Sequence, residues 1–245
     1  MKIAQADSST VNSLWTSLEP QLQQAKCLEE AAQAVSTSLH KQFADSIVLS
    51  RVFITVPFGS LPPANKTFVE NLAKSAGAES GLKPTTPILS LVGTQGQEPE
   101  WNDRRKSKGH MGIPLISSAF VGAIPMISRL LKELGVPLDW IDSHDSEIIK
   151  KTVGNSAGLF YVDDASTATD NEGRKIIAAQ DFVAKYKVKS VFGTGEAYSG
   201  GEMLANIMFC RDTVSRTTAE GFMEFSSRFK GKSAPLVESN RVFAN

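Results

Sequence analysis

The sequence predicts an α/β protein of the α+β kind, in which helices at the N-terminus and a closing helix at the C-terminus flank a central antiparallel β-sheet. Apolar residues recur at helical spacing in several segments, and β-rich segments lie between them. Two of these β-rich segments are separated by a turn that holds Gly200 and Gly201, which is typical of an antiparallel hairpin. Hairpin strands with helices beside them favour a sheet that the helices cover.

Each predicted element follows from the local pattern of apolar and β-forming residues. Helical spacing predicts helices over 11–25, 28–43, 64–76, 120–134, 178–186 and 217–229. β-rich composition predicts strands over 47–56, 87–92, 111–116, 159–162, 188–194 and 203–211. The polar stretch 93–109 is expected to be irregular.

Local signals and the absence of a linker define the predicted domain. Pro20 lies inside the first helical pattern and is expected to kink that helix or to start its second half. Thr217 and Glu220 form a capping box that opens the last helix. Because no linker divides the chain, we expect one domain over 1–231, followed by a loosely ordered tail over 232–245.

Bulk composition excludes several classes of protein. The 26 acidic and 26 basic side chains balance, so no nucleic acid or anionic membrane is expected as a partner. Cys27 and Cys210 are far apart in sequence, which excludes a disulfide framework and a zinc site built from cysteines. The most apolar stretch, 111–127, is short and interrupted by prolines, and no signal peptide precedes it. We therefore expect a cytoplasmic protein.

Three sequence patterns resemble catalytic or ligand-binding motifs, but each has a simpler, non-catalytic explanation. Residues 154–158 match G-x-S-x-G, the nucleophile pattern of α/β-hydrolases, but His40, His110 and His144 all precede Ser156, and that fold needs a later histidine. The glycines at 193–201 are explained by the hairpin. The acidic loop at 163–172 lacks the spacing of a calcium loop. The sequence therefore predicts no catalytic residue and no metal site.

The segment 101–110 is the most informative part of the chain for function. It combines Trp101, Arg104, Arg105 and His110 in ten residues of an otherwise neutral protein. Arginine binds carboxylate or phosphate through paired N–H groups, and tryptophan stacks on planar or cationic groups. This pattern predicts a site for an anionic or aromatic small molecule or for an acidic partner, and a solvated surface loop is the alternative interpretation.

The order of elements and the local sequence of 158–229 resemble the GAF family of ligand-binding signalling domains, with a GAF/PAS-like sheet. The strand at 160–164 ends in an acidic pair, and a helix, a strand at 188–193, a turn with a return strand at 198–209 and a last helix follow. Residues 28–56 are similar to the opening helix and first strand of that family. The middle, 57–142, is closer to N-terminal sensory regions of bacterial histidine kinases and related regulators.

The resemblance implies a non-catalytic sensor that binds a small molecule between the sheet and the segments crossing one of its faces. We expect Tyr161, Asp163 and Tyr198 to form the wall opposite the 101–110 segment. The module is expected to act through a separate signalling partner, such as a histidine kinase, or to be a fragment of a longer protein. The apolar stripes of the first two helices are expected either to form a homodimer or to cover the sheet. The sequence identifies neither the ligand nor a cofactor.

Two further interpretations of the function are retained. The first is a small enzyme that uses His110 and an aspartate such as Asp163 for acid–base chemistry, which needs the two groups within about 3 Å of each other or of a substrate. The second is a protein-interaction domain without a pocket. Bilin attachment and methionine sulfoxide reduction, known in relatives, need cysteines that this chain does not place near the expected site.

Overall fold

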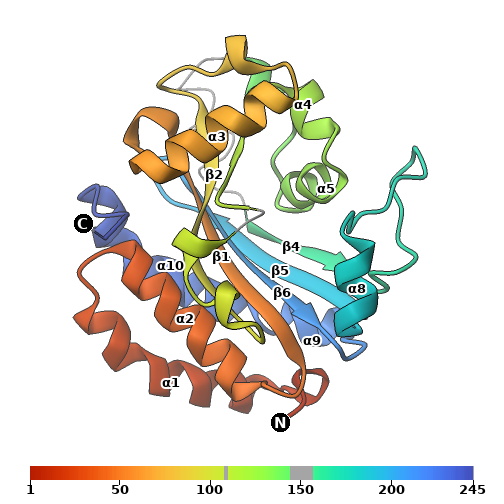
Figure 1. The fold of residues 1–245 in the computed structure, drawn as a ribbon. Helices are drawn as coiled ribbons and strands as arrows, with labels where there is room; N and C mark the ends of the chain where they lie inside the picture. Colours follow the sequence, from red (N-terminus) through yellow and green to blue (C-terminus); the bar gives the residue numbers. More distant parts are fainter. Residues whose placement is uncertain (108–109, 144–156, 245) are drawn as a thin grey trace.

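One antiparallel sheet forms the centre of the computed structural model, which describes residues 1–107, 110–143 and 157–244. Within those residues it has six strands in the order β3-β2-β1-β6-β5-β4, and every neighbouring pair is antiparallel (Figure 1). The strands are β1 (Ile47–Pro57), β2 (Pro87–Gly96), β3 (Gly112–Pro114), β4 (Ala157–Val162), β5 (Ser190–Ala197) and β6 (Met203–Cys210). The predicted α+β class and the β5–β6 hairpin are confirmed.

Helices cover both faces of this sheet. The α-helices are α1 (Ser8–Gln24), α2 (Leu28–Gln42), α3 (Pro63–Ser75), α4 (Ser118–Gly122), α5 (Pro125–Glu133), α6 (Trp140–Ser143), α8 (Gln180–Tyr186), α9 (Arg216–Glu220) and α10 (Met223–Glu238). Short 3-10 turns are η1 (Ile3–Gln5), η2 (Phe58–Ser60), η3 (Glu79–Gly81), η4 (Pro99–Trp101) and η5 (Arg104–Lys106). Among the described residues, no helix combines the length and the hydropathy needed to cross a membrane.

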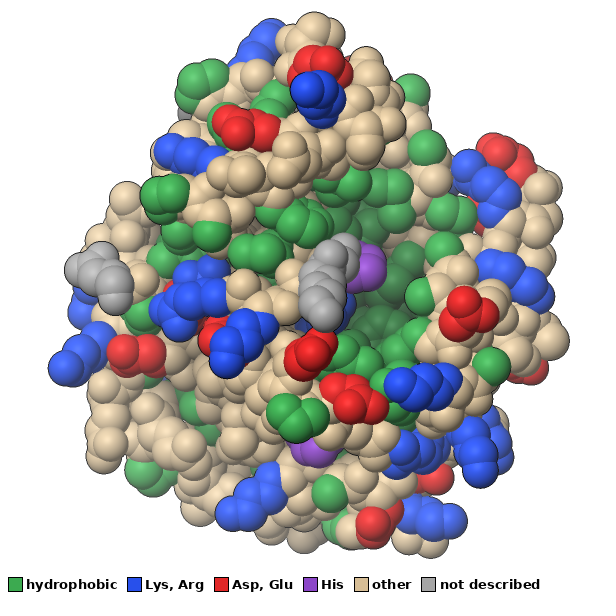
Figure 2. Space-filling view, viewed as in Figure 1, with side chains coloured by type: hydrophobic (Ala, Val, Ile, Leu, Met, Phe, Trp, Pro, Cys, Tyr) green, Lys and Arg blue, Asp and Glu red, His purple; other side chains and the backbone are tan. Residues whose placement is uncertain are grey.

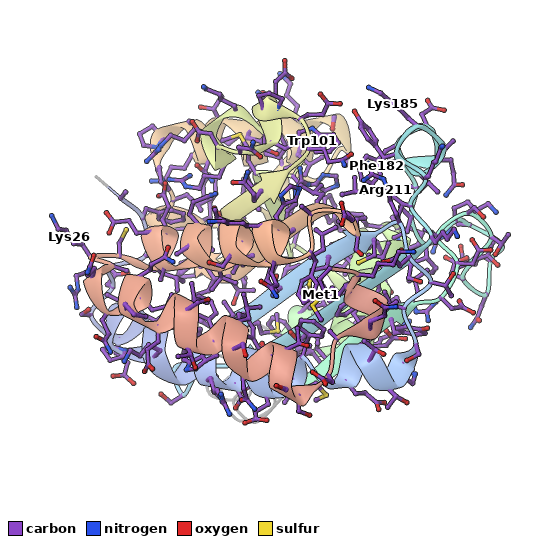
Figure 3. The ribbon with its side chains drawn as sticks, turned by 90° about the horizontal axis from the view of Figure 1, so that it is seen from below. Met1, Lys26, Trp101, Phe182, Lys185 and Arg211 are labelled. Carbon is purple, nitrogen blue, oxygen red and sulfur yellow. The ribbon has the colours of Figure 1, made fainter. Side chains whose placement is uncertain are left out.

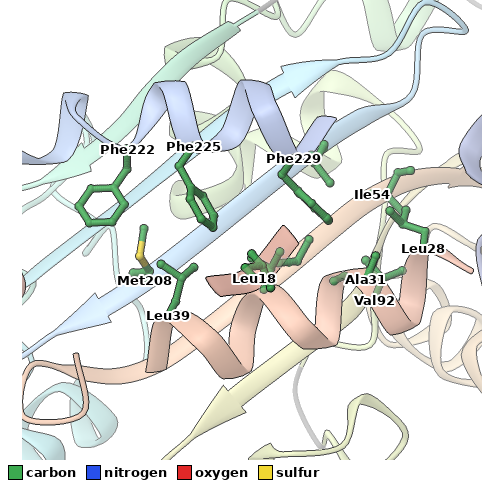
Figure 4. Packing of buried hydrophobic residues seen from close by; sticks show 14 of the residues in the cluster. Leu18, Leu28, Ala31, Leu39, Ile54, Val92, Met208, Phe222, Phe225 and Phe229 are labelled. Carbon is green, nitrogen blue, oxygen red and sulfur yellow. The ribbon is translucent and has the colours of Figure 1, made fainter. Parts of the chain in front are cut away.

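The long helices α1, α2 and α10 pack on one face, called here the first face. Figure 4 shows Leu39 of α2 and Phe225 and Phe229 of α10 lying against Ile54 and Met208 of the sheet. Each of these side chains is almost completely buried, and burial of one such side chain contributes about 1.5–3 kcal/mol. The apolar stripes of α1 and α2 are therefore used inside the monomer.

Shorter helices and loops cover the other face, called here the second face. The buried cluster of this face includes Ile127 and Leu131 of α5, Val183 of α8 and Phe209 of β6. Because these helices are short and separated, they do not fill the face as α1, α2 and α10 fill the other. The candidate site lies in the space that they leave.

Strand alternation decides which side chains of the central strand β1 reach the second face. Leu49 and Phe53 belong to the core cluster of this face, whereas Val52 and Ile54 belong to that of the first face. Successive side chains of a strand point to opposite sides, so Arg51 lies between Leu49 and Phe53 on the second face. An arginine is thus placed in the middle of an apolar sheet surface.

Two predicted helices begin and end differently in the structure. The helix predicted over 120–134 is broken into α4 and α5, because Pro125 has no N–H to continue α4 and instead starts α5. The last helix is also divided, at Gly221. Its first part is capped by Ser215, whose hydroxyl accepts a hydrogen bond from the Thr218 amide at 3.0 Å, and not by the predicted Thr217.

The loosely ordered tail predicted over 232–245 is not seen in the described residues. Helix α10 continues through Gly231 to Glu238, and Leu236, Val237 and Val242 are buried in the first-face core. The prediction failed because Gly231 looks like a helix end in sequence, whereas the apolar contacts beyond it hold the chain in place.

Candidate functional site

A cavity of about 340 Å³ opens on the second face of the sheet. Figure 2 shows it as a deep hollow lined by hydrophobic side chains. Its floor comes from the sheet and consists of Leu49, Arg51, Phe53, Leu89, Ile113, Ile207 and Phe209. Binding pockets for small molecules are about 300–1,000 Å³ and mostly apolar, so this hollow has the size and the lining of a small one.

Two elements form the walls of the cavity beside its floor. The start of α5 and the residue before it contribute Ile124, Pro125, Met126 and Ile127. The approach to α8 and its first turn contribute Ile176, Ile177, Ala178, Ala179 and Phe182. Ile176 and Ile177 are buried while Ala178 and Ala179 are exposed, so the two alanines lie at the mouth.

An aromatic cluster closes one side of the cavity. The ring of Trp101 lies 5.6 Å from that of Phe182, and Figure 3 shows the two residues side by side. The ring of Phe182 in turn lies 5.5 Å from that of Phe209. Trp101 also packs on Tyr186, with the ring centres 4.9 Å apart. Edge-to-face contacts of this kind fix ring orientation, so Trp101 presents a defined surface to the cavity. A Cβ at Gly96 would lie 2.7 Å from the Trp101 ring, and glycine therefore permits this approach.

Arg51 is the charged side chain of the cavity floor. Its Nη1 donates to Nδ1 of His110 at 3.2 Å, and its Nη2 donates to the Ser107 hydroxyl at 3.4 Å. Its Nε is buried and has no hydrogen-bond partner among the described residues. Burial disfavours the charged form and lowers the pKa of Arg51 to about 10, so the side chain remains a cation at neutral pH.

His110 lies beside this cation at the edge of the cavity. A guanidinium can only donate, so Nδ1 must accept and the ring proton must be on Nε2. Burial, with a further contribution from the charge of Arg51, lowers the pKa of His110 to about 4. The ring is exposed by surface area, but it lines the cavity, so part of that surface is cavity wall. At neutral pH the pair thus carries a single positive charge.

The four predicted residues of the 101–110 segment separate into two pairs. Trp101 and His110 line the cavity as expected. Arg104 instead pairs with Glu29 of α2 at 2.6 Å and stacks on Phe243. Arg105 pairs with the other oxygen of Glu29 at 2.9 Å. Both arginines therefore hold this loop on α2, and Arg104 also contacts the C-terminal segment through Phe243.

The wall predicted from Tyr161, Asp163 and Tyr198 is not formed. The Tyr161 hydroxyl donates to the Val214 carbonyl at 2.7 Å, and the Tyr198 hydroxyl lies 2.8 Å from that of Ser233 in α10. Both tyrosines pack with the first-face core, on the opposite side of the sheet from the cavity. The prediction was wrong because it ordered residues along the chain without knowing to which face each strand directs them.

Asp163 also lies outside the cavity. Its carbonyl accepts from Ser190, and its carboxylate accepts the amide of Asp164. The ring contact of His110 is with Arg51. The acid–base pair considered for an enzyme is therefore not brought together in the described residues.

Sequence reasoning missed Arg51, the residue that gives the cavity its charge. A signal was present: Arg51 interrupts the apolar run Ile47–Pro57, where a strand buried on both faces should hold no cation. Such an exception in a central strand points to a functional or strained position.

The other candidate sites in the described residues lack an arginine without a carboxylate partner. A second hollow of about 400 Å³ lies between α5 and the turn at 169–174, but its arginines are already paired, Arg174 with Asp170 and Arg129 with Glu133. Neither cysteine lines the main cavity. Within the described ranges, no group of three or more His, Cys, Asp or Glu is placed to hold a metal ion. The G-x-S-x-G serine, Ser156, and His144 lie outside the described residues.

Comparison with known proteins identifies the fold. No protein-family model and no curated protein sequence matches the chain. A free methionine-R-sulfoxide reductase from Neisseria meningitidis, solved with its substrate, aligns with a TM-score of 0.50 at 9% identity, over 96% of this chain and 95% of that one. The GAF domain of a phosphoenolpyruvate-protein phosphotransferase from Coxiella burnetii aligns with a TM-score of 0.50 at 10% identity, over 96% and 98%. The chain therefore has a GAF-like fold, as its C-terminal third predicts.

Proposed function

We propose that this GAF-like chain is a non-catalytic sensory module. It binds a small molecule in the second-face cavity and passes the resulting conformational change to a separate signalling partner. The observation that carries the proposal is the cavity itself, an apolar hollow of about 340 Å³ with one cation in its floor. A domain without a binding role has no need to leave such a space beside a central strand, because close packing would stabilise it further.

The segment 97–107 provides a route from the cavity to the C-terminal segment. It carries Trp101 at the cavity and, three residues later, Arg104. Arg104 binds Glu29, and the same carboxylate oxygen accepts the amide of Ala244 at 2.9 Å. A ligand that binds better to one position of Trp101 would therefore also bias the contact that holds the C-terminal segment.

The signalling partner, the cytoplasmic location and the homodimer belong to this proposal. A histidine kinase or a similar regulator is the kind of partner that the resemblance of 57–142 to sensory regions of such proteins implies. The apolar stripes of α1 and α2, which suggested the dimer, are buried in the monomer. A dimer would therefore use other surfaces, and sedimentation equilibrium of the purified chain measures whether it forms.

Binding can be tested with small probes and a blocked cavity. Indole, phenylacetamide, hexanamide, phenylacetate and hexanoate would be titrated against the chain by calorimetry. Ala178→Trp places a large ring at the cavity mouth, and Ala64→Trp adds the same ring at an exposed position of α3. We expect at least one probe to bind saturably to the wild type and to Ala64→Trp, and about tenfold or more weaker to Ala178→Trp.

Two results would contradict the proposal. One is that no probe binds saturably to the wild type. The other is that binding is unchanged in an Ala178→Trp variant that melts cooperatively, because the bound probe would then lie elsewhere on the molecule.

A further inference from the structure

The charge of Arg51 is not balanced by any carboxylate in the described part of the chain. Other arginines of the molecule show the usual solution, as Arg104 pairs with Glu29 and Arg129 with Glu133. Arg51 has two neutral partners, the ring of His110 and the hydroxyl of Ser107. These contacts leave its Nε–H and one N–H on each Nη without a partner among described residues.

The surroundings make an unpaired cation unfavourable. The rest of the described cavity lining is apolar apart from His110, and His110 is neutral at physiological pH. A charge in such a place is stabilised when an anion accepts its free N–H groups. The two oxygens of a carboxylate match two parallel N–H groups of a guanidinium.

We propose that the ligand of this cavity is a small apolar monocarboxylate, held by its carboxylate on the guanidinium of Arg51 and by its apolar body on the aromatic side around Trp101 and Phe182. This inference rests on the proposed function. It names the class of molecule that the cavity takes.

Charge and lining together select this class. One cation balances one negative charge, whereas a phosphate dianion would bring an excess charge into an apolar space with no second described cation to meet it. A cationic ligand would be repelled by Arg51. A neutral apolar ligand would fill the hollow but leave the guanidinium unpaired, so it binds more weakly than the acid of the same shape.

The test compares acids with amides of the same shape. Phenylacetate and phenylacetamide, and hexanoate and hexanamide, would be titrated by calorimetry at neutral pH, with phenyl phosphate as the dianion. The variants are Arg51→Met, which removes the charge but keeps an apolar side chain, and Arg51→Lys, which keeps the charge without the paired donors. Arg105→Met is the matched control, because Arg105 is exposed and lies outside the cavity.

We expect the wild type and Arg105→Met to bind each acid about tenfold or more tightly than its amide. Arg51→Met should lose this preference while its affinity for the amides stays within about twofold, and Arg51→Lys should retain part of it. If Arg51→Met does not fold, Arg51→Lys and the wild-type ratios decide the question.

Three outcomes would overturn the inference. They are equal binding of acid and amide by the wild type, an acid preference that survives in Arg51→Met, and tighter binding of phenyl phosphate than of phenylacetate. In each of them the cavity still binds a small molecule, so the proposed function would stand. If no compound binds at all, the proposed function fails together with the inference.

Discussion

Nη1 of Arg51 donates a hydrogen bond to Nδ1 of His110 over 3.2 Å, and this contact joins the centre of the sheet to the loop that borders the cavity. Arg51 comes from β1 and His110 from the segment that leads into β3. The histidine accepts but cannot neutralise the charge. The pair therefore keeps one positive charge in an apolar cavity. The effect of this charge on the stability of the ligand-free protein can be measured.

Arg51→Met is expected to stabilise the ligand-free protein. The substitution removes a partly buried cation that has no described carboxylate partner, and it adds apolar surface to an apolar floor. Replacing a buried ion pair by apolar side chains of similar volume is neutral or stabilising by about 1–4 kcal/mol, and for a single, partly buried cation we expect the lower end of that range. At the lower end of that range the melting temperature rises by about 2–4 °C, which differential scanning calorimetry detects. A melting temperature several degrees below that of the wild type would show that Arg51 is compensated.

His110 is expected to make the fold less stable in mild acid. Its folded-state pKa is about 4, below the usual value of 6.5, so the unfolded chain binds the proton first as the pH falls. The resulting loss of stability begins near pH 6.5, grows as the pH falls towards 4, and is absent above pH 7. Among the described cavity residues, Arg51 is the other ionisable group that faces the ring.

The measurement is the free energy of unfolding in urea at pH 7 and pH 4.5, for the wild type and for His110→Gln. The wild type should lose more stability between the two pH values than the variant does. His40 also has a pKa lowered by burial, but it is present in both proteins and cancels in the comparison. Equal losses in the two proteins would show that His110 does not titrate as described.

Periodicity predicted the fold well because it depends on local patterns. The β-rich apolar run of β1 and the helical spacing of Phe222, Phe225 and Phe229 are visible in the sequence, and each requires apolar surface to be covered. The split of one helix at Pro125 was also readable in principle, because proline favours the first turn of a new helix.

The site was only half predictable, because it depends on which face of the sheet each element covers. Trp101 and His110 were found from their unusual composition, and both line the cavity. Tyr161 and Tyr198 were assigned to the same site but lie on the opposite face, and no local pattern distinguishes the faces. Arg51 was missed because a single cation in an apolar run has meaning only when its neighbours in space are known.

Glu29→Gln is expected to destabilise the protein strongly. Glu29 accepts from the buried Arg104 and from the Ala244 amide, and it also pairs with Arg105. Loss of its charge leaves the Arg104 guanidinium, whose side chain is 5% exposed, without a counter-charge. Breaking a buried pair in this way costs about 3–5 kcal/mol, and the lower value corresponds to a fall of about 6–12 °C in the melting temperature.

Arg105→Ala is the control for this prediction. Its side chain is 54% exposed, so loss of its ion pair should cost at most about 1 kcal/mol. The two variants would be compared by urea unfolding. Similar small effects for both would mean that the buried contact of Arg104 contributes little to the attachment of the C-terminal segment.

Two glycines, Gly93 in β2 and Gly231 in α10, are expected to respond to alanine in opposite directions. A Cβ at Gly93 of β2 would lie 2.3 Å from the carbonyl oxygen of Ala32, so the alanine forces α2 away from the sheet. Overpacking of this kind costs about 1–3 kcal/mol. A Cβ at Gly231 of α10 meets nothing within 4 Å, and alanine there raises helix propensity by about 1 kcal/mol.

Thermal unfolding of the two variants tests both the packing of α2 and the course of α10. Gly93→Ala should melt below the wild type and Gly231→Ala above it, because Gly231 lies in the interior of a helix that extends to Glu238. The second result discriminates between two accounts of the C-terminus. If 232–245 were a loose tail, Gly231 would lie at a helix end, where alanine brings no such gain and strains any left-handed cap. An unchanged or lower melting temperature for Gly231→Ala would therefore contradict the continuous helix.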